Sequence, residues 1–345
     1  MSSLPNVLLM FFTFIIQMCC PAAIGTEVVE AYRGSDPAYA VYQKYRYAYD
    51  TYGYLFLLSE TQGNEATGQY EDASDAMGTG ISEPALADNE AYPVMAKLQD
   101  YDYLMKHFYS VNASTTAGRD LMQAEMLLGT DLRLAQDSSV PQILIYHTHS
   151  QETYADYGPG NRGANVVTAG QYLAELLRQK GWNVIHDTSS YDIQGGKLDR
   201  NKAYNYALEG ISGILQQHPT IQVILDLHRD GVDEGLHLVS QVNGKTTANV
   251  MFFQGMSQTP DGPIEYLPNP YLKENLAFSF QMQYLAAGKY PGFTRKIYLK
   301  GLRYNLHLRP RSTLIEAGAQ TNTLQEVLNA MEPLAELLDM VLQGN

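Results

Sequence analysis

Beyond residue 140 the chain alternates short apolar runs with longer amphipathic segments, and this alternation limits the folds open to it. The runs at 142–146, 182–187 and 221–227 predict buried strands, and segments with apolar residues at helical spacing separate them. Strands separated by helices form βαβ units, in which helices cover both faces of a parallel sheet. The sequence therefore predicts an α/β domain with a mostly parallel central sheet flanked by helices.

The other expected elements of this domain follow from the same patterns. Gly181 and Pro219 are typical residues for ending the first two helices. Asn243-Gly244 lies between two β-like runs and indicates a hairpin. We expect helices at 165–180, 199–217, 271–287 and 323–342, hairpin strands within 236–253, and a further strand at 312–316.

The region before this domain has a different character. Val7–Ile24 contains no charged residue, and its length lies between that of a signal-peptide core and the roughly 20 residues of a spanning helix. We expect it to direct export, leaving the protein either anchored in the cell membrane and facing outward, or secreted after cleavage near Gly25. Residues 26–139 form a Tyr-rich, mainly helical region with a Gly-, Ser- and acid-rich linker. The expected divisions are therefore 1–25, 26–139 and a catalytic domain at 140–345.

Composition narrows the chemistry. The formal net charge of −14 makes the chain a poor candidate for nucleic-acid binding, which needs clustered Lys and Arg. The two cysteines, Cys19 and Cys20, both lie in the N-terminal apolar stretch. A metal site in the rest of the chain must therefore use His, Asp and Glu.

Three predicted strands end in metal-binding residue types. The first ends in His147-Thr148-His149 with Glu152 nearby, the third ends at His228, and the strand near the C-terminus ends at Glu316. In parallel sheets, functional groups collect at the carboxyl ends of strands. Two imidazoles and a carboxylate would hold zinc with one open position for a water, and a second carboxylate would move its proton. The alternative is that these histidines only bond loop carbonyls.

Strand alternation places His147 and His149 on the same side, so periodicity does not choose between them.

The blocks YHTHSQETY, ILDLHRD and KGLRYNLHLRPRSTLIEAGAQTNTLQE, in this order and after a hydrophobic N-terminus, resemble the stage II sporulation protein P family. The resemblance covers residues 140–342. It implies a zinc amidase that cleaves the N-acetylmuramoyl-L-alanine bond of peptidoglycan, and also peptide cross-links, during engulfment in sporulation. It also implies a mother-cell membrane anchor, and stage II sporulation proteins D and M as partners.

The resemblance also implies roles for individual residues. The metal would be held by His147 or His149, by Glu152 and by His228, and Glu316 would be the catalytic base. Glu152 follows His149 more closely than the ligand Glu does in better-known amidases. The alternative functions are an exported zinc metallopeptidase or deacetylase of other specificity, and a non-catalytic wall-binding scaffold.

Overall fold

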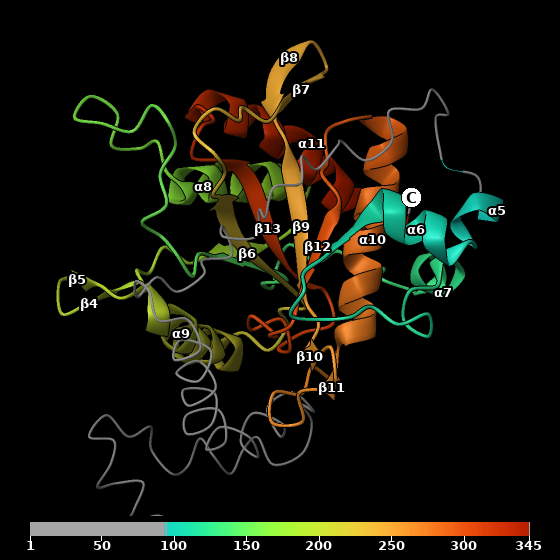
Figure 1. Ribbon diagram of the computed structural model, residues 1–345. Helices are drawn as coiled ribbons and strands as arrows, with labels where there is room; N and C mark the ends of the chain where they lie inside the picture. The colour runs from blue at the N-terminus through green and yellow to red at the C-terminus, as the bar shows by residue number, and fades with distance from the viewer. Residues whose placement is uncertain (1–92, 94, 345) are drawn as a thin grey trace, which may run out of the picture.

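The computed structural model describes residue 93 and residues 95–344, which build a central seven-stranded sheet with helices on both faces (Figure 1). The strand order is β1-β12-β9-β13-β6-β2-β3. All neighbours pair in parallel except β13 and β9, which are antiparallel. The sheet thus has two halves of opposite direction, and the predicted mostly parallel α/β architecture is confirmed.

The strands of the large sheet are β1 (Tyr109–Val111), β2 (Ile143–Tyr146), β3 (Val184–His186), β6 (Val223–Asp230), β9 (Val250–Gly255), β12 (Ile297–Lys300) and β13 (Ser312–Ala319). The helices are α5 (Met95–Leu98), α6 (Tyr101–Phe108), α7 (Ala124–Gly129), α8 (Val166–Gln179), the short 3-10 helix η3 (Arg200–Lys202), α9 (Ala203–Gln217), α10 (Leu272–Lys289) and α11 (Leu324–Gln343). Small hairpins are formed by β4 (Ile193–Gln194) with β5 (Lys197–Leu198), β7 (Val239–Val242) with β8 (Lys245–Ala248), and β10 (Gln258–Thr259) with β11 (Gly262–Pro263).

Local sequence signals account for several of these boundaries. The side chain of Asn165 caps α8 by accepting the Thr168 N–H, and Gly181 just beyond the helix has a positive φ. Asn243 and Gly244 both have positive φ in the turn between β7 and β8, as expected for a tight hairpin. Thr323 and Glu326 form a capping box at the start of α11.

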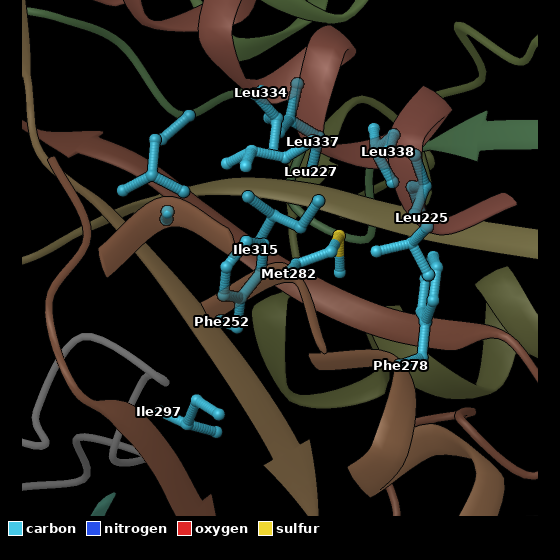
Figure 2. Packing of buried hydrophobic residues seen from close by; sticks show 14 of the residues in the cluster. Leu225, Leu227, Phe252, Phe278, Met282, Ile297, Ile315, Leu334, Leu337 and Leu338 are labelled. Carbon is cyan, nitrogen blue, oxygen red and sulfur yellow. The ribbon is translucent and has the colours of Figure 1, made fainter. Parts of the chain in front are cut away.

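The two faces of the sheet carry different cores. Leu225 and Leu227 of β6 lie in the larger cluster with Ile315 of β13 and side chains of α8, α10 and α11. Figure 2 shows these sheet residues facing the leucines of α11 and the Phe278 and Met282 side chains of α10. Alternate residues of the same strands, such as Ile224, face a smaller cluster under α9. Because β6 is covered on both faces, polar residues in it are buried.

The sheet extends past the boundary that we expected at residue 140. Strand β1 pairs in parallel with β12 at the sheet edge, and α7 packs against α10. We expected the region 26–139 to be mainly helical; its described part holds the helices α5, α6 and α7 and also the strand β1. The folded unit that holds the sheet thus includes residues from the region 26–139.

The apolar stretch 7–24 and most of the Tyr-rich region lie outside the described residues. Among the residues that the structure describes, no helix is both long and apolar enough to cross a membrane.

Candidate active site

The candidate site lies at the carboxyl end of the parallel half of the sheet. In the pairing of β13 with β6, Glu316 is directly opposite His228. Paired residues of adjacent strands project to the same face and are about 5 Å apart. Both side chains are almost fully buried, with 1% of their surface exposed. The predicted base and one predicted ligand are therefore neighbours on the face that α9 covers.

A turn after β2 brings Glu152 to this place. The N–H of Glu152 donates to the carbonyl of His149 at 3.2 Å, which closes a short turn. The Oε2 atom of Glu152 then lies 3.4 Å from Nδ1 of His228. The rings of His149 and His228 are edge to face, with centroids 5.4 Å apart. The structure thus brings His149, Glu152 and His228 together. The short spacing of three residues between His149 and Glu152 does not prevent this.

His147 is placed elsewhere. Its Nδ1 lies 2.8 Å from the carbonyl oxygen of Leu227 and its Nε2 lies 2.9 Å from Nε2 of His186. Gly170 of α8 leaves the room for this pair, because an added Cβ there would lie 2.6 Å from the His147 ring. His147 and His186 are on the α8 side of the sheet. Strand alternation failed here because β2 ends at Tyr146 and a turn follows.

The buried charges of the site stabilise one another. Burial by itself would lower the pKa of His228, but the adjacent carboxylates of Asp226 and Glu152 raise it well above its ordinary value. Burial acts to raise the pKa of Glu152, yet the positive charge of His228 holds it below its ordinary value. The side chain of Arg200 and the backbone N–H of Arg229 also donate to the Glu152 carboxylate, at 2.8 and 3.0 Å.

Sequence reasoning missed three side chains around the site. Asp226 lies 2.8 Å from Nε2 of His228. Tyr204 at the start of α9 contacts the His149 ring edge to face, with centroids 5.6 Å apart. Arg200 comes from η3, in a segment predicted only as helix. The signal for Asp226 was present, since a carboxylate interrupts the apolar run ILDL. No pattern marked the other two.

The donor set has the chemistry for zinc. Within residues 93 and 95–344, no group of three or more His, Cys, Asp or Glu side chains lies close enough together to hold a metal ion as placed. The side chains of His149 and Glu152 nevertheless both contact His228, so the place offers two imidazoles and a carboxylate, which are zinc-ligand types. The carboxylates of Glu152 and Asp226 flank His228 at its two ring nitrogens. Their negative charge would stabilise a divalent cation, so the donor types present fit the metal.

Comparison with known proteins identifies relatives of the chain. The family model of stage II sporulation protein P matches residues 60–339. The stage II sporulation protein P of Bacillus subtilis (strain 168) is 24% identical over 210 residues, which are 56% of this chain and 49% of that protein. The chain thus spans about half the length of the curated relative that it matches. The family match begins well before the blocks at 140–342 that carry the resemblance.

Similar solved structures include the N-acetylmuramoyl-L-alanine amidase AmiC2 of Nostoc punctiforme, 14% identical, with a TM-score of 0.35 over 61% of this chain and 98% of that one. The CwlD amidase of Clostridioides difficile, solved with the GerS lipoprotein, is also 14% identical, with a TM-score of 0.36 over 59% of this chain and 97% of that one.

Proposed function

We propose, from the premise that this chain belongs to the stage II sporulation protein P family, that it hydrolyses peptidoglycan during sporulation. The bond cleaved is the amide between N-acetylmuramic acid and L-alanine, and peptide cross-links are a second substrate. The observation that carries the proposal is the contact of His149, Glu152 and His228 beside Glu316, all of them buried at one end of the sheet.

His149, Glu152 and His228 would hold zinc, with one position left open. When bound, zinc supplies a hydrolytic water that loses its proton near pH 7. The buried carboxylates make this place negative, which favours a divalent cation over a monovalent one. Arg200 and the Arg229 N–H hold the Glu152 carboxylate in place, and Tyr204 packs against the His149 ring.

Glu316 is proposed as the general base. It lies on β13 opposite His228, so it is next to the proposed ligand set. It would accept a proton from the attacking water and return it to the α-amino group of L-alanine, which is the leaving group. His147 takes no part, because its ring faces His186 on the other side of the sheet.

Digestion of purified peptidoglycan, followed by mass analysis of the products, tests the proposal. We expect two products: free stem peptides, and glycan whose lactoyl groups no longer carry a peptide. Cleaved cross-links would show that the protein also acts as an endopeptidase. Loss of acetyl groups alone would identify a deacetylase, and an unchanged substrate would indicate a wall-binding scaffold. The Glu316→Gln variant is the control for a contaminating hydrolase.

We further propose that the apolar stretch Val7–Ile24 carries the catalytic part across the membrane, where it works with stage II sporulation proteins D and M. The support is the uncharged composition of the stretch and the family membership. A reporter fused after Gly25 should be active outside the cytoplasm. Reporter activity confined to the cytoplasm would contradict the proposal.

A further inference from the structure

Asp226 is a fully buried carboxylate inside β6, two residues before His228. Its Oδ1 lies 2.8 Å from Nε2 of His228 and also accepts the backbone N–H of Thr148 at 2.9 Å. Its Oδ2 accepts the Thr148 hydroxyl at 2.7 Å. A buried carboxylate is unfavourable unless paired, and the contacts of this one with His228 and Thr148 both border the candidate site.

The first consequence concerns the His228 ring. With Nε2 turned to Asp226, Nδ1 is the atom that faces Glu152, at 3.4 Å. The contact to Asp226 is within ion-pair distance, although Nε2 forms no hydrogen bond as placed. A histidine that binds a metal usually donates its other ring N–H to a carboxylate or carbonyl, which fixes the orientation and the tautomer of the ring.

The second consequence concerns the loop after β2. Thr148 separates the two histidines that diverge to opposite sides of the sheet, and both of its hydrogen bonds are to Asp226. The carboxylate therefore fixes the point from which the chain turns towards His149. The Asp226 side chain therefore links two proposed ligands: His228 on β6, and His149 in the loop after β2.

We propose that Asp226 is a positioning residue of the site: it orients His228 so that Nδ1 is the metal-binding atom, and it holds the His149 loop through Thr148. The inference rests on the proposed function, because it assigns a role towards the metal. The carboxylate touches neither substrate nor reacting atoms and acts only through His228 and Thr148.

The test uses the full-length chain and two zinc readouts besides activity. Zinc affinity is measured by competition with a chromophoric chelator, and the ring-nitrogen signals of His228 are recorded with ¹⁵N-labelled histidine and assigned by a His228→Gln variant. In the zinc-loaded parent, we expect Nε2 to carry the proton and Nδ1 to show the metal shift. For Asp226→Asn, we expect affinity to fall about 10–100-fold and this single ring state to be lost.

Two further variants separate positioning from folding. Thr148→Val keeps the contact with His228 while removing one bond to the loop, so a smaller loss of affinity is expected with the same His228 ring state. Asp230→Asn is the matched control. Asp230 lies four residues after Asp226 on β6, and its carboxylate is paired at 2.5 Å with buried Arg295. We expect it to lower the melting temperature and to leave the zinc affinity of the folded protein unchanged.

Parent-like affinity and ring state in Asp226→Asn would overturn the inference alone, as would zinc bound through Nε2 in the parent. A parent protein that takes up no zinc would overturn the proposed function together with the inference. An equal loss of affinity in Asp230→Asn and Asp226→Asn would show a general effect of strand stability and would also overturn the inference.

Discussion

His147 and His149 are two residues apart in the sequence, yet the structure gives them opposite surroundings. His147 lies under α8 with a second histidine as neighbour, while His149 lies under α9 against His228. The difference arises because β2 ends before both of them, so the turn rather than the pleat sets their directions. An HxH motif at a strand end therefore does not supply two equivalent ligands.

The surroundings also differ in charge. The α9 side collects Asp226, Glu152 and Glu316, whereas the His147–His186 pair is bordered by Gly170 and Gln171 of α8. Burial lowers the pKa of His147 to about 4, so this ring is neutral, while carboxylates raise the pKa of His228. Only the α9 side is built for a cation.

Removal of the metal should have the largest effect. If the α9 side holds zinc, a strong chelator should abolish hydrolysis of peptidoglycan, and added zinc should restore it. The melting temperature should also fall, because bound ligand stabilises the folded state. Undiminished hydrolysis by protein shown to be metal-free would contradict the claim that the α9 side holds a zinc ion needed for hydrolysis.

Replacing Glu316 by Gln should separate base from ligand on the α9 side. A carboxylate that moves a proton contributes about 10²–10⁴ in rate, so turnover should fall by that factor while zinc and fold are retained. His228→Ala is the contrasting variant and should lose both zinc and activity. If Glu316→Gln loses zinc as completely as His228→Ala, Glu316 is a ligand and its assignment as base is wrong.

The buried histidine on the α8 side should make the folded protein less stable in acid. The pKa of His147 is lowered from 6.5 to about 4 by burial, so between these values the unfolded chain binds a proton that the folded protein excludes. Stability should therefore decrease as the pH falls from 6.5 to 4, by about 3 kcal/mol for this group. Denaturant unfolding at several pH values measures the slope, and His147→Gln should reduce it. An unchanged slope in that variant would show that His147 is not the group responsible.

Adding a methyl group at Gly170, on the α8 side, should have the smallest effect of these changes. A Cβ at Gly170 would lie 2.6 and 2.7 Å from two His147 ring atoms, so Gly170→Ala should cost about 1–3 kcal/mol of stability through overpacking. Zinc content and turnover should be unaffected. Gly213→Ala on α9 is the control, because nothing lies within 4 Å of its added Cβ and the change favours the helix. A loss of zinc in Gly170→Ala would mean that the two sides are coupled.

The elements whose sequence signal lies within their own residues were predicted well. α8, α9, α10 and α11 follow from apolar periodicity and end signals, and β2 and β6 follow from uninterrupted apolar runs. β1 and β12 were not predicted, because Ser110 interrupts the first and Lys300 ends the second after three apolar residues, so neither forms a clear apolar run. The antiparallel position of β9 depends on long-range pairing with β13.

The site was predictable in its residue types and not in its geometry. His228 and Glu316 follow from their place at the ends of predicted strands, and the structure pairs them across β6 and β13. The choice between His147 and His149 depends on where β2 ends, which a short apolar run does not fix. Asp226 stood out as a carboxylate in an apolar run, but its role became apparent only from its contacts with His228 and Thr148.

The central claim is that the α9 side, through His149, is the metal site. Zinc per folded chain in His149→Ala and His147→Gln, measured on monodisperse protein by elemental analysis, tests it most directly. We expect a parent-like ratio for His147→Gln, even at reduced stability, and near-complete loss for His149→Ala. The reverse result, with zinc lost from His147→Gln and kept by His149→Ala, would contradict it.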